Sequence, residues 1–132
     1  MGRIFYNGRQ YSGNASPNYS TDEQIVGTWI DGRPIYEKTI YYAGGSSGTI
    51  TIPHNISNMG KCVDAFGTCH DQGYGSQHEG EGDMPLPRIA TDGYNVGIAG
   101  VNVTNIVLGI ASIWGSRIVD FYITLRYIKT ST

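Results

Sequence analysis

Residues 117–129 alternate apolar and polar side chains over a longer run than any other part of the chain. The apolar positions are Val119, Phe121, Ile123, Leu125 and Tyr127, and the positions between them are Asp120, Tyr122, Thr124 and Arg126. Successive side chains of a β-strand point to opposite faces, so this pattern is typical of an antiparallel strand with one buried face. A chain with such a strand needs a sheet whose apolar side is covered by another layer.

Two Asx-Gly pairs mark tight turns between strand-like runs. Asp31-Gly32 separates residues 24–30 from residues 35–42, and Asn7-Gly8 separates residues 4–6 from residues 9–11. Both central residues of a type I′ turn need positive φ, which Asp, Asn and Gly tolerate best. We therefore predict two hairpins with two-residue turns. Both faces of residues 35–42 are mixed, so the alternation leaves open which one is buried.

The composition and the spacing of turns indicate a β protein. Glycine accounts for 19 of the 132 residues and tyrosine for 10, and only 15% of residues are charged. No window keeps a helical stripe of apolar residues beyond about two turns, and turns recur about every 8–12 residues. We predict an all-β fold: an antiparallel, jelly-roll-like β-sandwich over residues 18–132, preceded by a short N-terminal hairpin and linker over residues 1–17.

The remaining strands and loops follow from shorter patterns. Strands are expected at residues 49–52, 61–70, 86–90, 94–103 and 106–113, and a flexible loop at residues 43–48. Residues 71–87 form the longest stretch without periodicity and contain four carboxylates but no Lys or Arg. Loops of this length inside compact domains are usually functional or disordered. This segment is therefore a candidate functional loop.

The charge distribution excludes some classes of partner. The nine Lys and Arg residues are scattered, and the net charge is −2. A sequence-independent nucleic-acid binder needs a concentrated basic face, so we expect no nucleic-acid partner. The most apolar stretch, residues 96–113, is interrupted by glycines and asparagines and is too broken for a membrane helix. We expect no membrane insertion.

Four residues have side chains that suit zinc: Cys62, Cys69, His70 and His78. Their C-x6-C-H-x7-H spacing is not a standard zinc pattern, so we expect no metal and no other cofactor. Regular alternation would place Cys62 and Cys69 on opposite faces of a strand and about 23 Å apart, too far for a disulfide. Two free thiols and two loop histidines are the simpler interpretation.

Three acidic residues alternate with other residues in the candidate loop: Glu79, Glu81 and Asp83. Their oxygens would suit calcium, and a pair of them would be needed for glycoside hydrolysis. The run lacks the pattern of an EF-hand, and nothing marks one acid as desolvated. The chain also lacks a nucleophile elbow, a P-loop, a dinucleotide fingerprint and a zincin motif. We expect a solvated acidic loop, no catalytic residues and no enzyme activity.

Aromatic residues in predicted turns are better candidates for binding. Tyr74, Tyr94 and Trp114 lie in such turns or loops, where binding sites concentrate. Flat aromatic faces bind sugars and anchor protein interfaces. We therefore name these three as candidate ligand-binding residues; the alternative is that they pack on the sandwich or on a neighbouring subunit. Trp29 and Phe121 are expected in the core.

Several stretches together resemble a known group of proteins. They are IFYNGRQYSG at residues 4–13, YSTDEQIVGTWIDGRPIYEKTI at residues 19–40, IPHNISNM at residues 52–59 and FYITLRYIKT at residues 121–130. They resemble small β-rich structural proteins of tailed bacteriophages and prophages, including tail-fibre, head-fibre and baseplate-associated proteins. The resemblance touches both ends and the middle of the chain, whereas residues 71–87 depart from it.

The resemblance implies a virion component that assembles in the bacterial cytoplasm. It implies a homo-oligomer, by analogy a homotrimer, with other virion proteins and a bacterial cell-surface glycan as partners. It carries over no catalytic residues. Two alternatives stay open: a structural or decoration subunit that binds no ligand, and a polysaccharide-acting enzyme with its site in the acidic loop. The host and the receptor are not specified.

Overall fold

The computed structural model describes residues 3–6, 9–12, 19–73, 82–89, 91, 93–115 and 117–130. Within these residues the chain forms ten strands and one short 3-10 helix, which confirms the predicted all-β class. The elements are β1 (Arg3–Tyr6), β2 (Arg9–Ser12), β3 (Gln24–Thr28), β4 (Pro34–Gly45), β5 (Gly48–Pro53), β6 (Met59–Gly73), β7 (Asp83–Leu86), β8 (Val96–Val101), β9 (Asn105–Ile110), η1 (Ser112–Trp114) and β10 (Ile118–Lys129). No helix in these ranges is long and apolar enough to cross a membrane.

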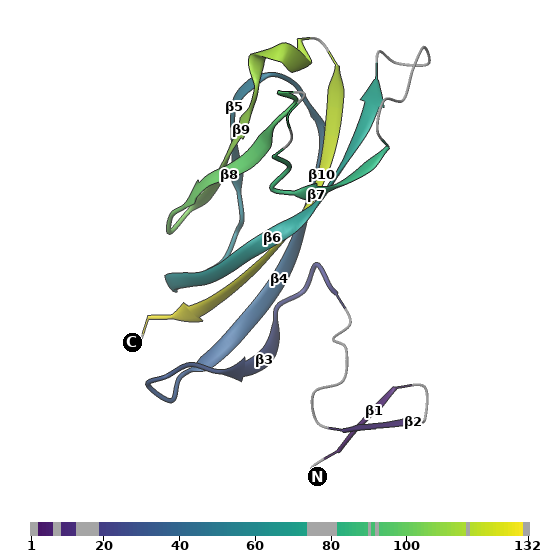
Figure 1. The fold of residues 1–132 in the computed structure, drawn as a ribbon. Helices are drawn as coiled ribbons and strands as arrows, with labels where there is room; N and C mark the ends of the chain where they lie inside the picture. The colour runs from purple at the N-terminus through teal and green to yellow at the C-terminus, as the bar shows by residue number, and fades with distance from the viewer. Residues whose placement is uncertain are drawn as a thin grey trace.

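Two antiparallel sheets build the main body (Figure 1). The large sheet has the order β3-β4-β10-β6-β7, and the small sheet has the order β5-β9-β8. The pairs are nested, because β4 pairs with β10, β5 with β9, and β6 with β7. A chain that folds back along itself in this way is jelly-roll-like. The predicted antiparallel β-sandwich is therefore confirmed.

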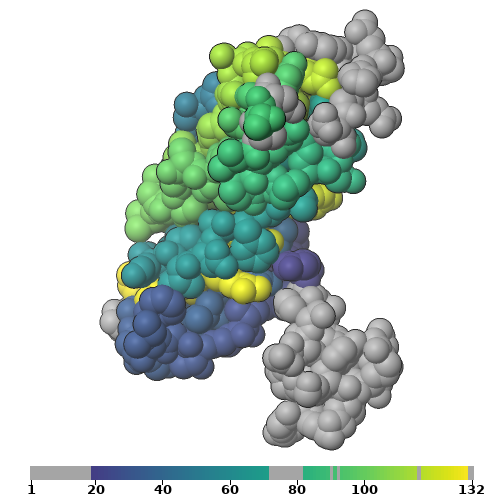
Figure 2. Space-filling view, viewed as in Figure 1, coloured from purple at the N-terminus to yellow at the C-terminus, as the bar shows by residue number. Residues whose placement is uncertain are grey.

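The core lies between the two sheets, and β10 contributes most to it. All five apolar residues of its alternating run, Val119, Phe121, Ile123, Leu125 and Tyr127, are 0% exposed. The facing residues of β9, Ile106, Leu108 and Ile110, are also buried. Because β10 pairs on both sides, its backbone groups are satisfied within the sheet. In Figure 2, β10 reaches the surface as a narrow yellow band between β6 in teal and the β3–β4 hairpin in blue.

The β3–β4 hairpin forms as predicted, but its turn differs. The Trp29 amide donates to the Arg33 carbonyl at 2.8 Å, and the Gly32 amide donates to the Trp29 carbonyl at 2.9 Å. The loop therefore has three residues, with Gly32 alone at positive φ, 93°. The predicted type I′ turn is wrong, since Asp31 keeps a negative φ while its carboxylate accepts from the Arg33 amide at 3.0 Å. This is a type I turn followed by a left-handed glycine.

The N-terminal hairpin has the predicted length. Tyr6 pairs with Arg9, which leaves two residues for the turn between β1 and β2. These two residues, 7 and 8, lie outside the described part of the chain, as do residues 17 and 18 at the predicted domain boundary.

Two predicted loops are partly strand. The flexible loop expected at residues 43–48 is largely absent, because β4 continues to Gly45 and β5 begins at Gly48. The ends of the 71–87 segment also pair, since β6 continues to Gly73 and β7 begins at Asp83. The strand predicted at residues 86–90 is displaced to β7. Pro87 has no amide donor, and after it the described residues contain an isolated pairing of Arg88 with Val96.

A bulge in β6 changes the orientation of one cysteine. The pairing of β6 with β10 shifts by one residue between Asp64 and Cys62, so Val63 is the extra residue. The shift turns Cys62 to the inner side, where it packs against the same core as the buried Cys69. The prediction that the two thiols face opposite sides is therefore wrong. Both cysteines are free.

Candidate functional site

The structure describes two of the three aromatic residues predicted to bind a ligand. Trp114 is 1% exposed and lies in the core, and the half-buried Tyr94 meets it edge to face with 5.2 Å between ring centroids. The Arg117 guanidinium lies 5.8 Å from the centre of the Trp114 ring. Placing Trp114 at a ligand is wrong, because η1 and Gly115, with φ of 56°, turn the ring inward. Tyr74 lies outside the described residues.

The same end of the sandwich contains a buried ion pair. The Arg117 guanidinium donates to the Asp71 carboxylate at 2.5 Å, and the two side chains are 10% and 2% exposed. Charges at this depth persist only when paired and hydrogen-bonded. The pair connects the end of β6 with the residue before β10, so we assign it a structural role.

The residues considered for metals are spread apart. Cys69 lies in the core, while the adjacent His70 faces the opposite side of β6 and pairs with Asp83 of β7 at 2.9 Å. Within the described ranges, no three His, Cys, Asp or Glu residues are placed to hold a metal ion. His78, Glu79 and Glu81 lie outside these ranges.

The outer face of the large sheet, opposite the core, carries a groove of aromatic and polar side chains. One hollow of about 350 Å3 is lined by Tyr19, Thr39, Phe66, Gly67, Thr68, Tyr122 and Thr124. A second hollow of about 200 Å3 is lined by Tyr41, Thr68, Cys69, His70, Asp83, Asp120 and Tyr122. The two hollows share Thr68 and Tyr122. We call the two together the tyrosine groove.

Strand register arranges the groove in three rows across the sheet. The rows are Thr39–Thr124–Phe66, then Tyr41–Tyr122–Thr68, then Asp120–His70–Asp83. Each row joins residues that are direct neighbours on adjacent strands, and each step along a strand by two residues moves to the next row. The groove therefore changes along its length from hydroxyls, through two tyrosines, to two carboxylates and a histidine.

The tyrosine row places two exposed aromatic side chains side by side in the groove. The rings of Tyr41 and Tyr122 are 48% and 55% exposed, with centroids 4.7 Å apart and planes inclined by 41°. Tyr19, 62% exposed, lines the hollow beside them. Partial desolvation, the Asp120 carboxylate and Tyr122 raise the pKa of the Tyr41 hydroxyl. This hydroxyl therefore stays protonated and can donate a hydrogen bond.

The polar residues of the groove are held by their own contacts. The hydroxyls of Thr39 and Thr124 are hydrogen-bonded at 2.9 Å, and an Asp120 oxygen accepts from the Gly44 amide at 2.9 Å. His70 is also paired with Asp83 at 2.9 Å, so the first and the third row each contain polar side chains held by hydrogen bonds. No Lys or Arg is among the described residues that line the two hollows.

A partly buried ion pair supports the hydroxyl end of the groove. The Arg126 guanidinium donates to the Glu37 carboxylate at 2.9 Å and lies 5.1 Å from the centre of the Phe66 ring. Glu37 is 1% exposed, so this pair fixes the arginine and, through it, the ring that lines the groove.

Gly67 lines the larger hollow between Phe66 of the first row and Thr68 of the second row. A Cβ atom there would lie 1.9 Å from the Tyr122 carbonyl oxygen, which belongs to the neighbouring strand. Only glycine therefore permits β6 and β10 to approach this closely beside the two tyrosines.

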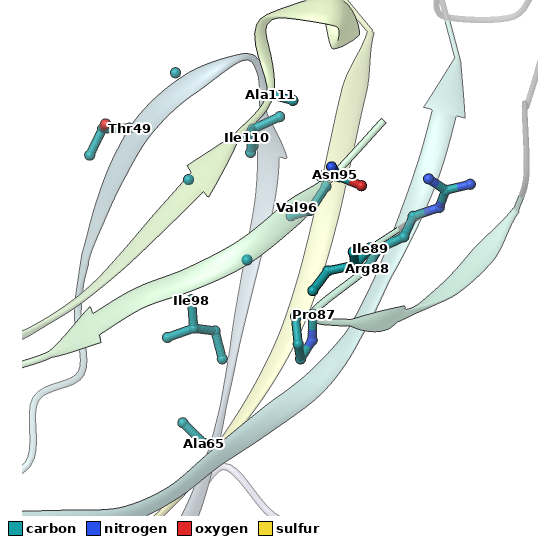
Figure 3. Close-up of a pocket in the computed structure, with 13 residues that line it drawn as sticks. Thr49, Ala65, Pro87, Arg88, Ile89, Asn95, Val96, Ile98, Ile110 and Ala111 are labelled. Carbon is teal, nitrogen blue, oxygen red and sulfur yellow. The ribbon is translucent and has the colours of Figure 1, made fainter. Parts of the chain in front are cut away.

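A larger cavity of about 700 Å3 opens between the two sheets near β8 (Figure 3). It is lined by Gly48, Thr49, Ala65, Pro87, Arg88, Ile89, Asn95, Val96, Gly97, Ile98, Gly109, Ile110 and Ala111, and we call it the glycine cleft. Figure 3 shows Ile98 and Pro87 directed toward the same space near Ala65. The Arg88 guanidinium donates to the Tyr94 carbonyl at 2.7 Å, so one of its nitrogens is engaged within the chain. The cleft is mainly apolar and offers little for chemistry.

The sequence contained a signal for the tyrosine groove. Tyr122 is the aromatic residue on the polar face of the run at residues 117–129, and an aromatic ring among polar neighbours is a sign of a binding surface. Tyr41 became its partner only through the register of β4 with β10.

Comparisons with protein-family models, with curated proteins and with solved structures found no match for this chain. A fold alone does not define a function, so the chemistry of the groove carries the functional argument.

Proposed function

We propose that this chain is an attachment module of a bacteriophage or prophage virion, which binds a bacterial cell-surface glycan through the tyrosine groove. The observation that carries the binding role is the exposed pair Tyr41–Tyr122 beside two hollows lined with hydroxyls and carboxylates. The virion assignment is supported by the resemblance of residues 4–13, 19–40, 52–59 and 121–130 to phage structural proteins.

The chemistry of the groove suits a sugar. A sugar ring has C–H groups on its faces and hydroxyls around its rim. The faces can pack on Tyr41 and Tyr122, while the rim bonds to groups such as Thr68 and Asp120. Because the hollows continue across four strands, β4, β10, β6 and β7, a chain of sugars fits better than a single one.

Binding at one shallow groove is expected to be weak, so the proposal includes a homo-oligomer. Several grooves on one assembly gain avidity without new contacts. A homotrimer is expected from the resemblance, with about three times the chain mass of 14.4 kDa. Size-exclusion chromatography with light scattering tests this, and a monomer at high concentration would contradict the oligomer.

Binding to host-range panels of whole bacteria, together with a glycan array, tests the attachment role. We expect the variants Tyr41→Ala and Tyr122→Ala to lose binding to cells and glycans while remaining folded. Ile30→Ala is the matched control, because Ile30 is 90% exposed at the tip of the β3–β4 hairpin and away from the groove. Full binding by both tyrosine variants would exclude the groove as the site.

A second candidate is a structural or decoration subunit that binds no glycan. The glycine cleft, whose lining includes the 83% exposed Ile89, favours this role, because an open apolar surface of this kind suits contact with a neighbouring copy. This candidate predicts that Ile98→Asp dissociates the assembly and that no glycan binds. No observation on the described residues favours the third possibility, a polysaccharide-acting enzyme.

A further inference from the structure

We infer that the glycan bound in the tyrosine groove carries free amino groups, so that an ammonium lies between the tyrosine row and the carboxylate row. The inference rests on the proposed function and names the class of sugar. It comes from the charges and rings that meet in the smaller hollow, which contains Tyr41, Tyr122, Asp120 and Asp83 together.

Two kinds of group that attract cations converge there. The faces of tyrosine rings attract an ammonium through the quadrupole of the ring. Carboxylates attract it by charge and accept its hydrogen bonds. Asp120 is half-buried beside the Tyr41 ring, and Asp83 is exposed at the other end of the same row. A hollow of about 200 Å3 has room for the substituent of a sugar rather than for a whole chain.

The surroundings give no comparable support to an anion. The described residues that line the two hollows include neither Lys nor Arg, and the one histidine, His70, already pairs with Asp83. Arg126, whose guanidinium lies over the Phe66 ring that lines the larger hollow, is paired with Glu37. A uronic acid or a phosphorylated sugar would therefore meet two carboxylates without a free cation.

The alternative within the same site is a neutral sugar. A neutral ring could pack on Tyr41 and Tyr122 and bond to the threonines, but it would leave the carboxylate row without a partner from the ligand. An N-acetyl group removes the charge and keeps the ring, so it separates the two cases. A lysine oligomer keeps the charge without the sugar and separates charge alone from sugar recognition.

The experiment measures binding of the full chain to oligomers of glucosamine, N-acetylglucosamine, glucose and glucuronic acid, and to a lysine oligomer, by calorimetry at fixed pH and salt. We expect glucosamine oligomers to bind about tenfold or more tightly than the others. The isosteric variants Asp120→Asn and Asp83→Asn should reduce this preference, because they remove the charges that attract the ammonium, and the ratio of the affinities for glucosamine and N-acetylglucosamine in each variant measures the reduction. Asparagine keeps the oxygen that accepts from the Gly44 amide, so the backbone contact of residue 120 remains available.

The outcomes separate the inference from the proposed function. Equal affinity for glucosamine and N-acetylglucosamine, or a preference that survives both asparagine variants, would overturn the inference. Equally tight binding of the lysine oligomer would overturn it too. If cells still bind and Tyr41→Ala abolishes that binding, the proposed function stands in each of these cases. Failure of the chain to bind any cell or glycan would overturn both.

Discussion

At the scale of single residues, Gly67 carries the strictest requirement in the large sheet. A methyl group there meets the Tyr122 carbonyl, and a backbone obstacle cannot rotate away. We expect Gly67→Ala to lower the free energy of unfolding by about 3 kcal/mol or more, since overpacking against backbone allows little relaxation. Urea denaturation measures the loss. Gly97→Ala is the control, because a Cβ at Gly97 has nothing within 4 Å, and equal stability of the two variants would contradict the prediction.

Cys69 should make the stability of the protein sensitive to alkaline pH. Burial raises the pKa of this thiol to about 11, from a usual value of about 9. Between these pH values the folded protein keeps the thiol proton, whereas the unfolded chain releases it. The contribution of Cys69 to the free energy of unfolding is therefore fully present below pH 9 and is lost as the pH rises toward 11.

The measurement is the free energy of unfolding in urea at a series of pH values from 8 to 10.5. We expect it to decrease above pH 9, and we expect Cys69→Ala to have a shallower decrease even if its stability is lower throughout. The comparison of slopes is needed because Tyr127, whose pKa is also raised by burial, contributes to the decrease at higher pH. Identical slopes for the two proteins would contradict this role of Cys69.

Single residues also mark the limit of what the sequence predicted about the site. Trp114 and Tyr122 are both large aromatics near turns or polar neighbours, yet one is 1% exposed and the other 55% exposed. Alternation along a regular strand predicts the side of Tyr122, whereas Trp114 belongs to a short 3-10 helix that has no such rule. For Trp114, position in a turn was therefore a poor guide to exposure.

At the scale of elements, β10 determines the stability of the sandwich. Its alternating residues face the core on one side and the tyrosine groove on the other. We expect Leu125→Ala to lower the free energy of unfolding by about 2–5 kcal/mol, because it removes buried methyl groups and leaves a cavity. Tyr122→Ala, on the opposite face of the same strand, should cost about 1 kcal/mol or less. Urea denaturation of both variants tests this, and similar losses would contradict the assignment of the two faces.

The strands that the sequence predicted correctly are those in which the local alternation of side chains agrees with the observed pairing of strands. β10 and the β3–β4 hairpin follow from alternation and from one Asp-Gly pair. β7 was missed because its four residues, DMPL, contain a proline and follow a glycine-rich segment, and they become a strand only by pairing with β6. The bulge at Val63 was not predicted either. A single inserted residue reverses the face of the positions beyond it, so the predicted orientation of Cys62 was wrong as well.

At the scale of the whole molecule, the proposed attachment role predicts that the strength of cell binding depends on the number of grooves that act together. We expect the assembled protein to bind whole cells at least about a hundredfold more tightly than one groove binds a soluble sugar oligomer. Binding to cells, compared with calorimetry on the oligomer, measures the ratio. A ratio near one would indicate that the grooves act singly and would argue against a multivalent attachment module.

The sandwich architecture was predictable from the sequence, whereas the arrangement of the tyrosine groove was not. The register of β4, β10, β6 and β7 places the three rows of the groove side by side, although their residues come from positions 39 to 124 of the chain. Such long-range register depends on the packing of the complete core and on bulges. For this reason the sequence analysis named aromatic residues in turns and loops, whereas the site that we propose lies on a face of the large sheet.

The position of β10 also constrains how the chain can acquire its fold during synthesis. β4 and β6 are both made well before β10, and they do not pair with each other, because β10 occupies the place between them. A ribosome adds about 5–20 residues per second, so both strands wait for several seconds with an unpaired edge and an uncovered apolar face. Strands in that condition can pair with the same strands of nearby nascent chains. For a protein made in many copies at once, the interval before β10 emerges is the period in which aggregation competes most strongly with folding.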